Sequence, residues 1–186
     1  PHAACYLVAT EAAVFGKLLA DPDRPYVVIL GGSKDSDKLG VVENLLKVVD
    51  RLLVGGGMAY TFLAAAGHTV GKSLLEPDMI DTVKRLVADA TARGVDVVVP
   101  VDVVIADNFA PDAATQVVSA DAIPDDWQGL DIGPATRALF ASKIADAKTV
   151  VWNGPMGVFE MPAFAAGTRA VAEAMCCMPA TTGIGG

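Results

Sequence analysis

The chain has 186 residues, with 14 lysines and arginines against 22 aspartates and glutamates, and a formal net charge of -8 at pH 7. This length fits one domain or part of a larger protein, and the acidic balance argues against a general nucleic-acid binder, because binding to a phosphate backbone needs a basic surface. Hydrophobic residues make up 53% of the chain and charged residues 19%, which indicates a globular protein with enough apolar material for a core.

The apolar segments are too short for a membrane protein. The run 26–30 ends after about five residues, whereas a bilayer span needs roughly 20. The first twenty residues contain Glu11 and no basic start, so they do not resemble a signal peptide. Three cysteines, of which Cys176 and Cys177 are adjacent, form no disulfide framework. We therefore expect a cytoplasmic protein without a membrane partner.

Predicted helices and strands alternate in the first part of the chain. Residues 3–20 have apolar side chains at near-helical spacing and predict a helix, which ends at a break rich in proline and aspartate. Residues 26–30 are continuously apolar and predict a buried strand followed by two glycines. An amphipathic helix is expected over 36–50, and a strand over 52–54 ends in three glycines.

The alternation continues to the end of the chain. Helices are predicted over 77–93, 134–147 and 162–177, and strands over 95–99, 101–105 and 149–152. Residues 107–133 are rich in Asp, Ala, Pro and Gly and are expected to be an irregular excursion. Asp102 and Asp107 suit turn-forming and strand-capping roles better than acid/base or metal chemistry. Short apolar strands separated by helices indicate an α/β fold, a doubly wound, Rossmann-like parallel sheet with helices on both faces.

Glycine-rich segments follow several predicted strands. They lie at 31–32, 55–57, 154–157 and 183–186. In open α/β sheets a ligand binds beyond the carboxyl ends of the strands, where glycine lets backbone N–H groups approach an anion. A nucleotide is the natural ligand, although any single cluster could simply mark a tight turn.

The common nucleotide fingerprints are incomplete in this sequence. Residues 67–73 look like a phosphate loop, but its first glycine would fall at Ala66, and the preceding residues predict a helix rather than a strand. We reject it for both reasons. No G-x-G-x-x-G follows a strand, which leaves little support for a dinucleotide oxidoreductase.

Two lysines follow the first glycine pair. Lys34 and Lys38 are four residues apart, so both ammonium groups face one side if the turn passes into a helix. Two cations beside a glycine turn suit a transferable phosphate, because phosphoryl transfer requires the charge on the equatorial oxygens to be neutralised. A solvated helix face has the same spacing, so the pair alone leaves both interpretations open.

Five blocks together resemble the phosphoglycerate kinase family, in its order and at similar spacing, and they extend over almost the whole chain. They are 31–38 (GGSKDSDK), 55–63 (GGGMAYTFL), 100–102 (PVD), 129–134 (GLDIGP) and 151–160 (VWNGPMGVFE). The resemblance is to the C-terminal nucleotide-binding domain, here 21–186 and truncated at its C-terminal end. Residues 1–20 resemble the interdomain connecting helix, and the N-terminal substrate domain is expected to lie outside this chain.

The resemblance implies a role for each matching residue. Lys34 would be catalytic and stabilise the phosphoryl group in transfer, and Lys38 would contact the nucleotide phosphates. The other residues that it places at the nucleotide are Gly32, Gly56, Gly57, Gly129, Asn153, Gly154, Met156, Phe159, Glu160 and Gly186. Of these, Met156 and Phe159 would wall the adenine pocket, and the Glu160 carboxylate would accept hydrogen bonds from the ribose hydroxyls.

The implied reaction is the reversible glycolytic transfer of a phosphoryl group between 1,3-bisphosphoglycerate and ADP. ATP/ADP and phosphoglycerate would be the ligands, with Mg²⁺ bridging the nucleotide phosphates and its aspartate ligand beyond residue 186. The resemblance implies a monomer, and we expect these residues alone to be inactive. Asp35 stands where the family usually has an apolar residue, which keeps open the alternative of a non-catalytic adenine-nucleotide-binding module.

Overall fold

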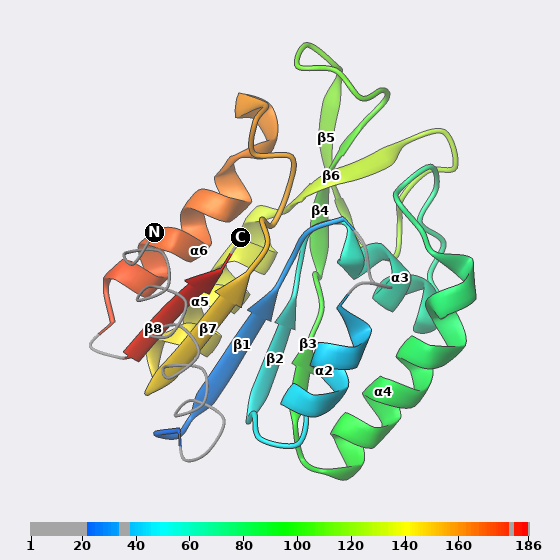
Figure 1. The fold of residues 1–186 in the computed structure, drawn as a ribbon. Coiled ribbons are helices and arrows are strands. Elements are labelled where there is room, and N and C mark those ends of the chain that lie inside the picture. The colour runs from blue at the N-terminus through cyan, green and yellow to red at the C-terminus, as the bar shows by residue number, and fades with distance from the viewer. Residues whose placement is uncertain (1–21, 34–37, 179–180, 186) are drawn as a thin grey trace, which may run out of the picture.

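A computed structural model describes residues 22–33, 38–178 and 181–185, which form two β-sheets and the helices around them (Figure 1). The larger sheet has five parallel strands in the order β3-β2-β1-β7-β8. Its strands are β1 (Tyr26–Leu30), β2 (Arg51–Val54), β3 (Asp96–Val98), β7 (Thr149–Asn153) and β8 (Thr181–Gly185). The helix expected over 3–20 lies outside the described residues.

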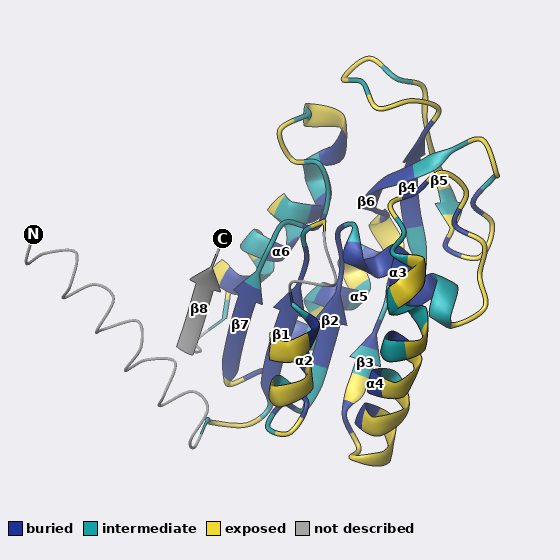
Figure 2. Cartoon of the chain, turned by 45° about the vertical axis from the view of Figure 1, so that its right-hand side comes forward, coloured by how far each residue is buried: buried dark blue, intermediate teal, exposed yellow. Residues whose placement is uncertain are grey.

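Helices cover both faces of the larger sheet. One face is covered by α2 (Leu39–Leu45), α3 (Met58–Ala65) and α4 (Ile80–Ala92). The other face is covered by α5 (Pro134–Ala145) and α6 (Ala166–Cys176). The 3₁₀ turns η1 (Pro77–Met79) and η2 (Pro162–Phe164) precede α4 and α6. Figure 2 shows the buried central strands between helices whose outer surfaces are exposed. The predicted doubly wound α/β fold is confirmed.

Strand β1 illustrates why the central strands of the larger sheet are mostly apolar. Val28 packs with the helices of one face and Val27 with those of the other, because successive side chains of a strand point to opposite sides. All five β1 residues are buried. A strand covered on both faces therefore shows no polar alternation, which is the pattern in the sequence.

The expectation of an irregular segment over 107–133 is wrong. β5 (Thr115–Ser119) and β6 (Gln128–Ile132) both pair antiparallel with β4 (Asp102–Ala106), and they form a second sheet in the order β5-β4-β6. The signal is weak because β5 is almost wholly exposed and β6 contains glycine and aspartate, which are depleted from strands. Tertiary pairing overrides that local preference.

The apolar run 95–105 is divided between the two sheets. β3 lies at one end of the described parallel sheet, whereas β4 is the middle strand of the antiparallel one. Pro100 lies between them, where the absence of a backbone N–H does not interrupt a ladder. The smaller sheet is thereby carried beyond the carboxyl ends of β1 and β2 (Figure 1).

Asp102 and Asp107 have structural roles, as the sequence favours, although Asp102 caps a helix and not a strand. Asp102 Oδ1 accepts a hydrogen bond from the Thr136 backbone N–H at 2.8 Å, and Oδ2 accepts one from that of Ala135 at 3.0 Å, which caps the start of α5. Asp107 Oδ1 accepts a hydrogen bond from the Ala114 N–H at 3.1 Å within the loop between β4 and β5.

The helix expected over 36–50 is shorter than predicted. Lys38 is the N-cap of α2, and the helix ends at Leu45. Beyond it, the Lys47 and Val48 N–H groups bond to carbonyls three residues back, the tighter pattern in which helices commonly end. In the described ranges no helix is long and apolar enough to cross a bilayer.

Candidate functional site

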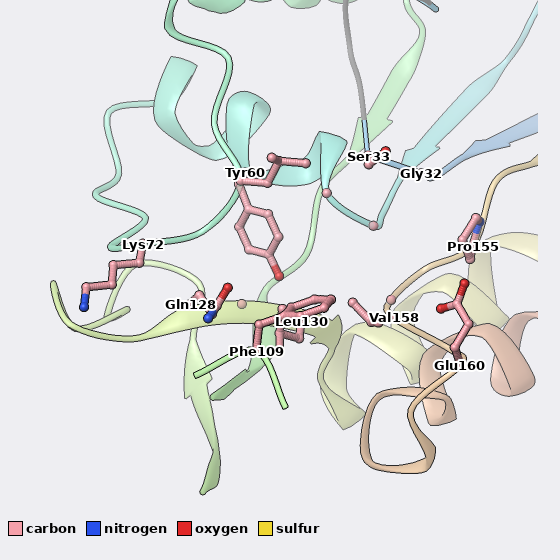
Figure 3. Close-up of a pocket in the computed structure, with 15 residues that line it drawn as sticks. Gly32, Ser33, Tyr60, Lys72, Phe109, Gln128, Leu130, Pro155, Val158 and Glu160 are labelled. Carbon is pink, nitrogen blue, oxygen red and sulfur yellow. The ribbon is translucent and has the colours of Figure 1, made fainter. Parts of the chain in front are cut away.

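A cavity of about 500 Å³ lies where the two sheets meet, at the carboxyl edge of the larger one (Figure 3). Its walls come from the loops after β1, β2 and β7, from α3, from the turn around residue 72, from the loop between β4 and β5, and from β6. The strand order reverses between β1 and β7, since β1 leads to β2 on one side and β7 leads to β8 on the other. Ligands of open α/β sheets bind at such a reversal.

Five of the predicted site residues line this cavity. They are Gly32, Gly56, Gly57, Gly129 and Glu160. Glycine is required at Gly56, whose φ is +63° and where an added Cβ would lie 2.6 Å from both Gly32 N and Pro155 O. The glycine clusters therefore let three chain segments approach one another at one wall of the cavity.

Asn153 and Gly154 join two of these loops and are not themselves among the wall residues. The Gly31 N–H donates to the Asn153 carbonyl at 2.8 Å, and the Gly32 N–H donates to the Pro155 carbonyl at 3.0 Å. Gly154 has a φ of +85°, and an added Cβ there would overlap the Gly31 carbonyl. The loops after β1 and β7 are thus held in direct backbone contact.

Lys38 lies at the β1 end of the cavity. Its Nζ donates to the Gly31 carbonyl at 2.7 Å, and a Cβ added at Gly32 would lie 2.9 Å from this Nζ. The ammonium group is therefore next to a wall glycine. Lys34 and Gly186, two further predicted site residues, lie outside the described residues.

Met156 and Phe159 are near the cavity but are not among its lining residues. Met156 is buried beneath the glycine turns, since a Cβ added at Gly31 would lie 2.7 Å from its Cε. Its N–H donates to Thr168 Oγ1 at 3.0 Å. Phe159 is about half exposed, at 49%. The apolar wall of the cavity is formed instead by side chains that include Phe109 and Val158.

Three polar wall residues were not singled out from the sequence, namely Tyr60, Lys72 and Gln128. Tyr60 lies three residues after Gly57 on α3, a spacing that places both on one side of a helix and could have identified it. Lys72 belongs to the segment rejected as a phosphate loop. The rejection agrees with the structure because a helix, α3, precedes that segment. Lys72 reaches the cavity because its N–H donates to the Trp127 carbonyl at 2.8 Å, beside Gln128.

The buried carboxylate of Asp131 supports the cavity from behind. Its Oδ1 accepts a hydrogen bond from the Ile132 N–H at 2.8 Å, and its Oδ2 accepts one from the Gly167 N–H at 2.9 Å, at the start of α6. A Cβ added at the wall residue Gly157 would lie 2.5 Å from Asp131 Oδ1. Burial raises the pKa of this carboxyl to about 6, although the two N–H donors and the Arg137 guanidinium oppose the shift.

Asp131 is expected to make the fold lose stability as the pH rises from about 4 to about 6. The carboxyl has a pKa of about 6 in the folded chain and an ordinary value of 3.8, so the folded state binds the proton more tightly. The contribution of this bound proton to the free energy of unfolding is complete below the ordinary pKa and is lost as the pH rises through the pKa of the folded chain. The loss is at most about 3 kcal/mol. Urea unfolding of the wild type and of Asp131→Asn, compared at several pH values, measures this. The variant should gain relative stability from pH 4 to 7, and a constant difference would contradict the expectation.

The described residues contain no group of three or more His, Cys, Asp or Glu side chains placed to hold a metal ion. Cys176 and Cys177 both have free, exposed thiols.

Comparisons with known proteins relate the whole chain to one family. Residues 1–186 match the family model described as phosphoglycerate kinase. The phosphoglycerate kinase of Frankia casuarinae is 61% identical over 186 residues, which are 100% of this chain and 46% of the relative. That of Herpetosiphon aurantiacus is 55% identical over the same length, with 47% of the relative covered. The chain spans about half the length of these curated relatives.

Solved structures of phosphoglycerate kinases have the same fold. The enzyme from Coxiella burnetii matches with a TM-score of 0.94 at 43% identity, over 97% of this chain and 46% of the other. The Pyrococcus horikoshii enzyme matches with a TM-score of 0.82 at 28% identity, with the same coverage.

Proposed function

The chain belongs to the phosphoglycerate kinase family, and on this basis we propose that it is the nucleotide-binding part of an enzyme that moves a phosphoryl group between 1,3-bisphosphoglycerate and ADP. The observation that carries the proposal is the cavity at the strand-order reversal, because wall residues from four of the five family-like blocks meet there. Such a cavity has the size and the mixed polar and apolar lining of a nucleotide site.

Charge and shape suggest how ADP would lie in the cavity. Lys38 at the β1 end would attract the phosphates, and the exposed Glu160 carboxylate would accept hydrogen bonds from the ribose hydroxyls. The base would lie against Leu130 and Phe109, with the flat backbone of Gly129 beside it. Met156, buried under the glycine turns, would keep the phosphate end in shape.

In the forward direction, the bond between phosphorus and the acyl oxygen of 1,3-bisphosphoglycerate breaks, and a bond forms to a terminal oxygen of ADP. Lys34 is proposed to stabilise the charge on the phosphoryl oxygens during this step, and Lys38 to hold the nucleotide. Mg²⁺, when bound by the nucleotide phosphates, would neutralise their charge. No covalent intermediate with the protein is needed, since positioning and electrostatics suffice.

The proposed enzyme needs more than these residues. The relatives are about twice as long, so we propose that their other half supplies the phosphoglycerate site and that the 186 residues alone do not turn over. We also propose that the enzyme acts as a monomer in the cytoplasm, where the free thiols of Cys176 and Cys177 would stay reduced.

Two measurements test this function. Calorimetric titration of the 186-residue chain with ADP should give saturable binding. A chimera that joins the N-terminal half of the Frankia casuarinae relative to this chain should then form ATP from ADP and 1,3-bisphosphoglycerate. Binding of ADP without turnover in a folded chimera would favour the non-catalytic nucleotide-binding module. Absence of ADP binding would refute both.

A further inference from the structure

The loop that follows β7 forms one side of the cavity. The described residues 154–161 form neither a helix nor a strand between β7 and η2. They nevertheless supply four wall residues, namely Pro155, Gly157, Val158 and Glu160. Pro155 and Glu160 lie across the cavity from Lys72 (Figure 3). Because the loop has no regular structure of its own, the placement of these wall residues depends on its contacts with other segments.

Met156 lies within this loop and connects it to two other parts of the fold. Its carbonyl accepts a hydrogen bond from the N–H of Gly56, a wall residue of another loop, at 3.0 Å. Its own N–H donates to Thr168 Oγ1 at 3.0 Å. The Met156 side chain is buried in the same apolar cluster as Val171 and Met175 of α6. Met156 therefore links α6, behind the loop, to a glycine in the cavity wall.

The first turn of α6, which carries Thr168, is anchored to β6. The Gly167 N–H donates to Asp131 Oδ2 at 2.9 Å, and a Cβ added at Gly167 would overlap the Asp131 carboxyl group. The Asp131 side chain is fully buried, so it cannot turn out into solvent. The loop itself is bonded to the same strand, because the Val158 N–H donates to the Leu130 carbonyl at 3.0 Å. The Thr168 hydroxyl is thus a fixed acceptor for the loop.

The hydroxyl of Thr168 serves the loop rather than the helix. The N-cap of α6 is Ala165, whose side chain has no hydrogen-bonding group, and the Arg169 N–H bonds to the Ala165 carbonyl at 3.1 Å. Valine has the same branching as threonine and would keep this helix, but it offers no acceptor to Met156. Without that bond the loop could adopt further arrangements. The apparent affinity of a ligand falls with the fraction of molecules whose site has the binding arrangement.

We propose that Thr168 is a positioning residue for the nucleotide, whose hydroxyl holds Met156 and the wall residues on either side of it in the arrangement that binds ADP. This inference rests on the proposed function, since it assumes that ADP occupies the cavity. Thr168 is not itself a wall residue, so it acts through the loop and not by contact with ADP.

Thr168→Val tests the proposal because it removes the hydroxyl and keeps a β-branched side chain of similar size. In a calorimetric titration the variant should bind ADP about 3- to 10-fold more weakly, the range for the loss of one neutral hydrogen bond. Thr168→Ser keeps the hydroxyl and should bind ADP as the wild type does. A serine variant that binds as weakly as the valine variant would show that the hydroxyl does not position the loop.

Steady-state kinetics separate positioning of the nucleotide from a general defect. In the chimera with the N-terminal half of the Frankia casuarinae relative, Thr168→Val should raise the KM for ADP by the same factor and leave kcat near that of the wild type. The reason is that the loop would contact ADP equally in the ground state and in the transition state. A fall in kcat with an unchanged KM would contradict the inference.

Thr149→Val is the matched control for lost stability. Thr149 is 1% exposed, and its Oγ1 donates to the Asp23 carbonyl at 2.8 Å, but it begins β7, at the opposite end of the strand from the loop. Its melting temperature should fall as that of Thr168→Val does, with ADP affinity unchanged. If Thr168→Val binds ADP like the wild type, or if Thr149→Val weakens binding equally, the inference is overturned while the proposed function stands. If the wild type itself does not bind ADP, both fail.

Discussion

Gly154→Ala is expected to destabilise the fold by more than about 3 kcal/mol and to abolish ADP binding, because left-handed strain and backbone overlap add together. Gly154 has a φ of +85°, which an L-residue adopts at a cost of about 1–2 kcal/mol. An added Cβ would also overlap the Gly31 carbonyl and lie 2.9 Å from Gly32 N. These are backbone atoms, so no flexible side chain can move aside.

The hydrogen bonds between the loops prevent an easy relaxation. The loops after β1 and β7 are joined by the bonds from Gly31 N to Asn153 O and from Gly32 N to Pro155 O. Separating the loops to admit a methyl group breaks these bonds, and it moves Gly32, a wall residue, out of place. Stability and binding should therefore be lost together.

Gly94→Ala provides the matched control for the strain alone. Gly94 has a φ of +76°, close to that of Gly154, but an added Cβ there would meet nothing within 4 Å. It should cost about 1–2 kcal/mol and leave ADP affinity unchanged. Urea unfolding and calorimetric titration of both variants measure the difference. Equal destabilisation by the two substitutions would show that the contact between the loops contributes nothing.

Lys38→Met and Lys34→Met are expected to damage different steps of the proposed reaction. Lys38 Nζ lies against the wall residue Gly32, so its loss should weaken ADP binding about 10- to 100-fold, the range for hydrogen bonds to charged groups. Lys34 follows Ser33, another wall residue, and its substitution in the two-lobe chimera should lower kcat by about 100-fold, as loss of a transition-state donor does.

Lys47→Met controls for the change in net charge. Lys47 is exposed on the turn after α2 and does not line the cavity. Its substitution removes the same positive charge as that of Lys38. It should leave both the affinity for ADP and kcat unchanged. If Lys47→Met weakens ADP binding as much as Lys38→Met, the effect is one of overall charge and not of position. If the chimera with Lys34→Met turns over normally, the proposed catalytic role of Lys34 is refuted.

The buried strands of the larger sheet could be predicted from the sequence because a buried strand is a short run of apolar residues. β1, β2 and β7 are short apolar runs, since a strand covered on both faces has no solvent side. β5 has no such signature because its side chains face solvent, and it exists only because β4 pairs with it. The sequence alone therefore missed the smaller sheet that completes the cavity.

The residues of the candidate site likewise include some that could be predicted from the sequence and some that could not. The glycines at 32, 56, 57 and 129 could be recognised because they lie in glycine-rich turns or in the blocks that resemble the family. An added Cβ would meet backbone atoms at Gly56, whereas at Gly129 it would meet the Tyr60 side chain. Tyr60, Lys72 and Gln128 are ordinary residues in their local context. They become neighbours only through tertiary contacts, such as the bond from Lys72 N to the Trp127 carbonyl.

The sequence by itself determined the family, the doubly wound sheet and the glycine turns at its carboxyl edge, because apolar runs and family-like blocks are local properties of the chain. Only the tertiary structure decided which side chains complete the cavity. In the fold, Met156 is buried beneath the glycine turns and Phe159 is half exposed. The phenol of Tyr60 packs against Gly129, in the space that a side chain there would occupy. Such placement depends on which segments pack together, and the packing of distant segments is a property of the whole fold.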